Sequence, residues 1–153
     1  MGETSMRATG WARSFPVSGG VRAGRRWARV HLDALGWTVH APDTADDVLL
    51  TVSELITNAH LHAHSDAQLV LLWDRRCLHV SVHDASTELP QLRSPDPVRP
   101  NGRGLAIVDT LADSWRAHPQ GGGKTITACF HAPGRPGPAP APLTDGTADR
   151  APG

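Results

Sequence analysis

The chain has 153 residues, which is enough for one domain with a substantial hydrophobic core. Lysine plus arginine and aspartate plus glutamate each number 15, so the formal net charge is zero. This composition gives no electrostatic reason to expect binding to nucleic acid or to an anionic membrane surface. No apolar run approaches the ~18 residues that a membrane-spanning helix needs.

The start of the chain and its cysteines favour a cytoplasmic protein. The opening residues MGETSMRATGWARS contain no apolar segment of the kind found in signal peptides, so we expect no export signal. Cys77 and Cys129 do not form a CxxC pair. We interpret them as free, largely buried thiols in a reducing cytosol.

The first part of the chain is predicted to contain a tail, a short strand and a helix. Residues 1–12 are small and polar, and we expect a flexible tail there. The segment WARSFPV favours a short edge strand that ends at Pro16. From Val21 to Leu35 apolar residues recur at near-helical spacing, and Gly36 is a suitable helix stop.

A second helix, predicted over about 45–64, carries an unusual set of polar residues. Its apolar residues follow helical spacing, whereas Glu54, Asn58 and His62 stand four residues apart on the opposite side. Asparagine is unfavourable inside a helix because its side chain competes for backbone hydrogen bonds. We therefore interpret Asn58 as a functional residue.

Strands dominate the second half of the chain. Alternating hydrophobicity predicts a hairpin of strands over 67–73 and 77–83. The segment 86–103 is rich in proline and has no usable period, so we expect a lid there. A short helix is predicted within 104–115, and a glycine turn then leads into a last strand within 121–132.

This order of elements indicates an α+β fold. Helices come first and strands follow with one inserted helix, which favours a two-layer sandwich of helices on one face of a mixed, mostly antiparallel sheet. We expect the domain to span residues 13–132. Proline, glycine and alanine dominate residues 133–153, which are expected to be disordered.

Two glycine-rich segments resemble phosphate-binding loops only in part. GGGKT has His118 where a Walker A loop needs its first glycine, and it precedes a strand instead of a helix. GRGLAI has Ile107 where the dinucleotide fingerprint needs its third glycine. Gly102 and Gly104 remain as glycines at a helix start, where free backbone N–H groups can bind phosphate. The alternative is a glycine turn that merely ends a flexible loop.

The order of the motifs resembles that of the GHKL ATPase family. ELITNAHLHA is similar to the N box, VHDASTELP stands where the G1 box lies, GRGLAIVDTLADSW is similar to G2, and GGGKTITACF to the terminal G-x-T strand. The resemblance covers roughly residues 12–132. It is closest to the bacterial anti-sigma-factor serine/threonine kinases with a stand-alone histidine-kinase-like ATPase domain. It implies a Bergerat-type ATP-binding fold.

The resemblance implies roles for the N-box residues. In the family this helix faces the triphosphate, so the side-chain oxygen of Asn58 is expected to hold the Mg²⁺ that bridges the phosphates of ATP. Glu54, one turn earlier, takes the place of the general base. His62 matches the histidine of the N-box pattern and is assigned to nucleotide binding. The alternative for this side of the helix is an ordinary solvated face.

The other motifs are also implied to contact ATP. Asp84 is expected to accept a hydrogen bond from the adenine amino group, although the usual D-x-G-x-G reads DASTE here. The alternative for Asp84 is an ordinary aspartate at a strand end. Thr125 is implied to reach the adenine or phosphate from the last strand, and Lys124 beside it is expected to be exposed. The G2 residues assigned to nucleotide binding are Gly102, Arg103, Gly104 and Leu105.

The run HLHAH admits a second interpretation as a zinc site. His60 and His64 share a helix face and have the spacing of two zinc ligands, but no third ligand is evident. We therefore favour a role for these two residues at the helix end.

These assignments leave open two classes of function. The first is an ATP- and Mg²⁺-dependent protein kinase that phosphorylates a serine or threonine on an anti-anti-sigma-like antagonist and also binds a sigma factor or similar regulator. The second is a nucleotide-dependent partner-binding module without kinase activity. A nucleotide-free scaffold is a third reading, against which the Glu54/Asn58 pair argues. Many relatives form homodimers, so the resemblance also allows a dimer.

Overall fold

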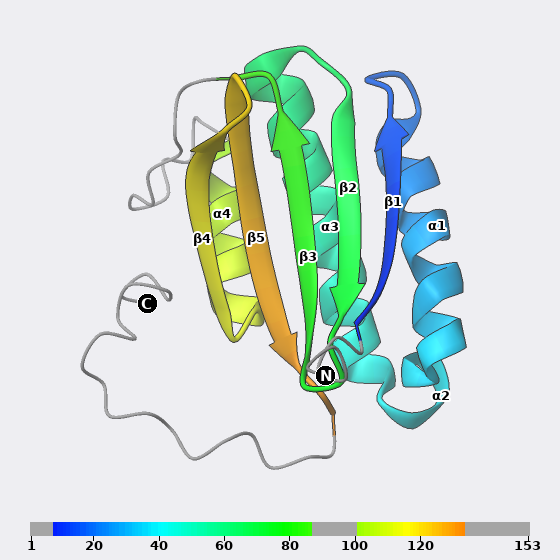
Figure 1. Ribbon diagram of the computed structural model, residues 1–153. Coiled ribbons are helices and arrows are strands. Elements are labelled where there is room, and N and C mark those ends of the chain that lie inside the picture. Colours follow the sequence, from blue (N-terminus) through cyan, green and yellow to red (C-terminus); the bar gives the residue numbers. More distant parts are fainter. Residues whose placement is uncertain (1–7, 87–100, 134–153) are drawn as a thin grey trace, which may run out of the picture.

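The computed structural model describes residues 8–86 and 101–133, without the side chains of residues 62, 63 and 101–104. The strands are β1 (Thr9–Phe15), β2 (Ala67–Trp73), β3 (Cys77–Asp84), β4 (Ser114–Gln120) and β5 (Gly123–His131). They form one sheet in the order β1-β2-β3-β5-β4, and each neighbouring pair is antiparallel (Figure 1).

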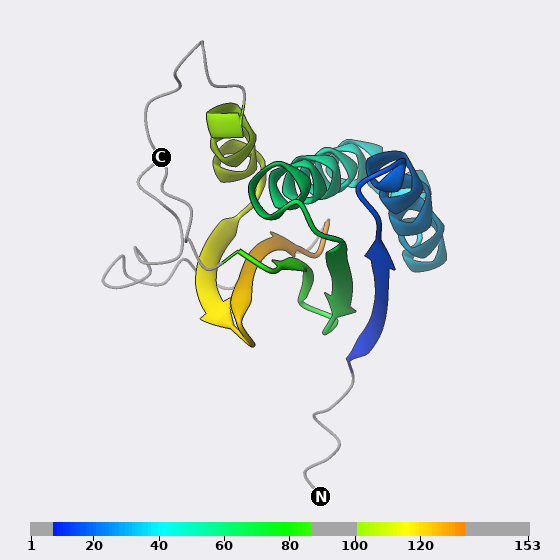
Figure 2. The same ribbon diagram turned by 90° about the horizontal axis from the view of Figure 1, so that it is seen from above.

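The helices form a single layer on one face of this sheet. They are α1 (Gly20–Leu35), α2 (Trp37–His40), α3 (Pro42–Ala63) and α4 (Asn101–Leu111). Seen from above, α3 lies over the middle of the sheet, between α1 and α4, and the opposite sheet face carries no helix from the described residues (Figure 2). The predicted α+β two-layer architecture is therefore confirmed.

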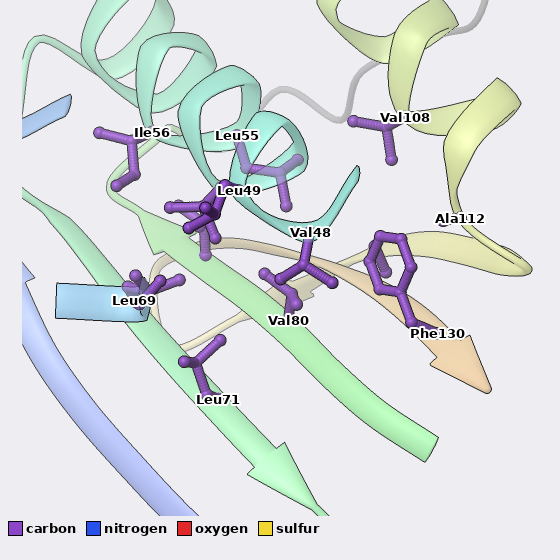
Figure 3. Packing of buried hydrophobic residues seen from close by; sticks show 14 of the residues in the cluster. Val48, Leu49, Leu55, Ile56, Leu69, Leu71, Val80, Val108, Ala112 and Phe130 are labelled. Carbon is purple, nitrogen blue, oxygen red and sulfur yellow. The ribbon is translucent and has the colours of Figure 1, made fainter. Parts of the chain in front are cut away.

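The core lies between the sheet and the helix layer. Alternate residues of β3 and β5 point toward the helices and are buried, while α3 contributes the largest apolar stripe (Figure 3). The central members of this cluster are Val48, Val52, Leu55, Ile56, Leu69, Leu71, Leu78, Val80, Ile126 and Phe130. Full burial of each such side chain contributes roughly 1.5–3 kcal/mol, so this layer fixes α3 against β3 and β5.

Several element boundaries differ from the sequence predictions. The β1 strand begins at Thr9, so the last four residues of the predicted tail are paired with β2. The α4 helix begins at Asn101, so it includes the last residues of the predicted lid at 86–103. The rest of that lid after residue 86, and the predicted tail after Pro133, lie outside the described residues.

The β4 strand was not predicted. Its sequence SWRAHPQ has a single fully apolar buried residue, Trp115, and it occupies the edge of the sheet. An edge strand with one solvated side gives little alternation, and Pro119 near its end further obscured the pattern. No described helix combines the length and hydropathy that crossing a membrane requires.

Candidate functional site

The segments that carry the sequence motifs converge at one end of the domain. The β3 strand ends at Asp84, β5 begins at Gly123, and α4 begins at Asn101, all at the end where α3 finishes (Figure 1). The α3 helix contacts α4, β3 and β5. Residues that are far apart in sequence are thereby placed around one region between the helix layer and the sheet.

Asn58 is the most unusual polar residue at this end. Its side chain is only 4% exposed. Among the described residues no group forms a hydrogen bond with its Oδ1. Leu55 stands three residues before Asn58 in the sequence. Figure 3 shows that Leu55 lies on the side of α3 that faces Val108 of α4. Because buried polar atoms are nearly always hydrogen-bonded, an orphaned oxygen here is available for a ligand.

The burial of Asn58 corrects the reading of this helix side as an ordinary solvated face. Glu54, one turn earlier, is half-buried, and this desolvation raises the pKa of its carboxyl group. A carboxylate with raised proton affinity is better suited to accept a proton than a fully hydrated one. The structure thus brings together a free oxygen ligand and a potential base on α3.

Asp84 and Lys124 form a buried ion pair at the start of β5. Lys124 Nζ donates to Asp84 Oδ2 at 2.7 Å, and both side chains are 2% exposed. The backbone N–H of Ser86 donates to Asp84 Oδ1 at 2.8 Å. The expectation that Lys124 is exposed is therefore wrong. The antiparallel register pairs these two residues directly, and alternation along β5 turns both toward the helix layer.

Gly123 allows the two strands to meet closely at this point. A Cβ atom at position 123 would lie 1.9 Å from the backbone oxygen of Asp84, so no larger residue fits without moving β3 or β5. The glycine of the GGGKT segment therefore serves a close backbone approach beside the ion pair. The sequence alone indicated only a glycine turn that leads into the last strand at this position.

A family model described as histidine kinase-like ATPase domain matches residues 19–130 of the chain. The chain belongs to this family. A search of curated proteins gave no match. The matched range covers α3, β3, α4 and all but the last residue of β5, which are the elements that meet at the site.

Membership in the histidine kinase-like ATPase family implies ATP binding, and the residues present fit a magnesium-bound nucleotide. The amide oxygen of Asn58 is a neutral oxygen ligand of the kind that Mg²⁺ accepts beside water and phosphate. The first backbone N–H groups of α4, from Asn101 to Gly104, belong to a helix start and lack intrahelical acceptors. Such a helix terminus favours phosphate.

The side chains of two predicted nucleotide contacts, Thr125 and Leu105, do not face the site. Thr125 points to the open face of the sheet, where its hydroxyl is hydrogen-bonded to Gln120 and lies 3.0 Å from His83 Nδ1. It is thus separated from Asn58 and Asp84 by the sheet itself, and we withdraw it from the proposed contacts. Leu105 is buried in the core, so only its backbone is suited to a ligand contact.

The histidines near the end of α3 have separate surroundings. His60 is buried, and its Nε2 lies 3.3 Å from the backbone oxygen of Phe15, which ties α3 to β1. His64 caps the C-terminus of α3 with a left-handed backbone conformation. The described residues contain no group of three side chains arranged to hold a metal ion. The His62 backbone lies in α3, and its side chain is outside the described part of the structure.

Proposed function

We propose that this ATPase domain binds Mg·ATP and acts as a serine/threonine protein kinase on an anti-anti-sigma-like antagonist. The observation that carries the proposal is the buried Asn58 oxygen, which has no described hydrogen-bond partner and lies one turn after the half-buried Glu54. An orphaned polar atom in a core costs stability, and a ligand that satisfies it explains why it is retained.

In this proposal each residue has a distinct task. Bound Mg²⁺ supplies charge neutralisation on the phosphates. Asn58 holds the cation through Oδ1, and the backbone N–H groups at the start of α4 bind phosphate oxygens. Glu54 accepts the proton of the attacking hydroxyl group. The hydroxyl oxygen forms a bond to the γ-phosphorus while the bond from that phosphorus to ADP breaks, so the phosphoryl group passes to the protein substrate.

Asp84 is assigned to the adenine amino group. Its carboxylate already receives Lys124 Nζ and the N–H of Ser86. A carboxylate has about four lone-pair sites, so it retains capacity for one further donor. The buried Lys124 ammonium group carries three N–H donors, and its Asp84 bond leaves others to donate to a ring nitrogen of the base.

The second candidate is a partner-binding module whose nucleotide occupancy controls affinity for a regulator such as a sigma factor. It is favoured by the surroundings of Glu54, because no described side chain forms a hydrogen bond or ion pair that orients its carboxylate. General bases are usually held in place by such a partner. In this case the domain binds Mg·ATP without transferring its phosphate.

Calorimetric titration with ATP, in the presence and absence of Mg²⁺, tests the shared part of both candidates. We expect binding that weakens strongly when Mg²⁺ is removed. Incubation with labelled ATP and purified antagonist proteins then separates the two, because only the kinase transfers label. An absence of nucleotide binding under both conditions contradicts the proposal, whatever the partner.

A further inference from the structure

Figure 2 shows that the helices cover only one face of the sheet, and a second cluster of reactive side chains lies on the opposite face. Alternation along β3 and β5 turns one polar residue of each strand to this face at every second position, and cross-strand neighbours contact one another. Ser81 and Thr127 pair through their hydroxyl groups at 2.8 Å. His79 and Cys129 form the next pair toward the β2–β3 turn.

The imidazole of His79 connects a thiol to a carboxylate. Its Nδ1 lies 3.1 Å from Cys129 Sγ, and its Nε2 lies 3.0 Å from Asp74 Oδ2. Asp74 is itself fixed in the turn, because its Oδ1 accepts the backbone N–H groups of Arg76 at 2.9 Å and Cys77 at 2.8 Å. Both ring nitrogens are therefore engaged, and the ring orientation is set by the backbone of the turn.

The charges in this cluster favour a proton on the imidazole. The hydrogen bond with Cys129 is the largest cause that raises the pKa of His79 to about 9, burial opposes it, and the hydrogen bond with Asp74 adds to it. Burial favours a higher pKa for Asp74, but the bonds from Cys77, His79 and Arg76 outweigh this and lower it to about 2. An imidazolium beside a thiol stabilises the thiolate, which is the nucleophilic form of cysteine.

We propose that Cys129 is a site of oxidation by hydroperoxides, with His79 as the proton donor to the departing oxygen and Asp74 as a positioning residue. The thiolate sulfur attacks one oxygen of hydrogen peroxide, so that an S–O bond forms and the O–O bond breaks. The departing hydroxide takes the proton that His79 Nδ1 held and leaves as water. The sulfur loses two electrons, the peroxide gains them, and the products are a sulfenic acid and a neutral imidazole.

Access to the cluster is consistent with this reaction. Cys129 is only half-buried, and no described helix covers this sheet face. The cluster does not suit a metal ion, since His79 stands between the other two groups and the described residues contain no convergent set of ligands. It lies on the opposite side of the sheet from Asn58 and Asp84, so the proposal is independent of nucleotide binding.

Cys77 is an internal control for this proposal. It lies on β3, two residues before His79, and on the same sheet face as His79 and Cys129. Like Cys129, it is half-buried. Burial raises the pKa of its thiol, and the charges of Asp74 and Cys129 raise it further. The two cysteines therefore share exposure and neighbourhood but differ in contact with the imidazole.

The test is sulfenic acid formation in the full chain treated with dilute hydrogen peroxide. A dimedone-type probe traps the product, and peptide mass spectrometry reports labelling at each cysteine. We expect at least tenfold faster labelling at Cys129 than at Cys77. His79→Gln should reduce the Cys129 rate to that of Cys77, and Asp74→Asn should reduce it partly. His83→Gln, which changes another histidine on this face, should leave it unchanged.

The pH profile of iodoacetamide alkylation distinguishes activation by His79 from a purely structural role. Other ionisable groups on this part of the sheet face are Arg76, Cys77, Asp113, Arg116 and His131. We expect the alkylation rate of Cys129 to depend less steeply on pH between 6 and 8 in the parent than in the His79→Gln variant. Circular dichroism checks that the variants are folded. Equal rates at both cysteines, or a folded His79→Gln variant with unchanged labelling, would overturn the proposal.

Discussion

Lys124 Nζ lies 2.7 Å from Asp84 Oδ2 in a buried ion pair between β3 and β5, at the end of the sheet where α3 finishes. Removing two charges from water costs several kcal/mol per ion, and only good geometry and further hydrogen bonds offset this cost. The Ser86 N–H supplies one such bond to the carboxylate. The pair is thus a strong local constraint on how β3 and β5 meet.

Lys124→Met should destabilise the protein by about 3–5 kcal/mol, because it leaves the Asp84 carboxylate buried without a countercharge. The double variant that combines Lys124→Met with Asp84→Asn should regain much of the lost stability, because it leaves no buried charge without a partner. Urea denaturation of the two variants and the parent measures the difference. A single variant that loses less than about 1 kcal/mol would show that water already reaches this pair.

Asn58→Ala should abolish most of the Mg·ATP affinity while leaving the free energy of unfolding unchanged or slightly higher. The substitution removes a buried oxygen that has no described partner, so little native interaction is lost in the ligand-free protein. Calorimetry with Mg·ATP measures the change in affinity, and denaturation without nucleotide measures the change in stability. Unchanged nucleotide affinity would contradict the assignment of Asn58 as the metal ligand.

Thr51 offers a matched control on the same helix. Its Oγ1 is also buried without a hydrogen-bond partner among the described residues, seven residues before Asn58 and hence near the same side of α3. Thr51→Val is nearly isosteric and removes the unsatisfied hydroxyl. It should affect stability much as Asn58→Ala does, yet leave Mg·ATP affinity intact, because it lies two turns from the proposed ligand.

The sequence predicted the architecture better than the details of the site. Helical spacing in α3 and alternation in β3 are strong signals, and they placed Glu54, Asn58 and Asp84 on the correct elements. The orientation of β5 residues was assigned wrongly. Side chains alternate between the two faces along β5, and Ile126 points to the core. The same alternation places Lys124 inward and Thr125 outward, as the structure has them.

Other features depend on contacts that one segment does not reveal. Asn58 is buried on a helix that contacts α1, α4 and the sheet, and helix spacing alone shows only that it stands opposite the apolar stripe. The close approach at Gly123 depends on the register of two strands that are distant in sequence. The His79–Cys129 contact likewise joins residues fifty positions apart, so it has no local sequence signature.

The unfolding free energy should fall as pH rises from 6.5 to about 9, because His79 has a raised pKa in the folded protein. The stabilising contribution of His79 is fully present below its pKa in the unfolded chain, 6.5, and disappears above its pKa in the folded protein, about 9. Partial exposure of the His79–Asp74 pair limits the effect to about 1 kcal/mol or less. His79→Gln should flatten this part of the pH profile, whereas His83→Gln should keep it.

Asp74 should produce the opposite dependence at acid pH. Its pKa is lowered to about 2 in the folded protein, so its contribution is present above the ordinary value of 3.8 and is lost as pH falls toward 2. Asp74→Asn should reduce the loss of stability in this acid window. Denaturation series at pH 2.5, 4 and 6 make the comparison, and parallel profiles for variant and parent would contradict it.

Glu54→Gln should separate nucleotide binding from phosphoryl transfer. Glutamine is nearly isosteric and keeps helix propensity, so Mg·ATP affinity should stay within about twofold of the parent. A general base contributes roughly 10²–10⁴-fold to the rate, so the variant should lose nearly all transfer to an antagonist protein. Equal transfer by variant and parent would exclude Glu54 as the base while leaving ATP binding in place. Transfer by neither protein, with Mg·ATP binding intact, favours the partner-binding module, in which the half-buried Glu54 carboxyl is no longer required for chemistry.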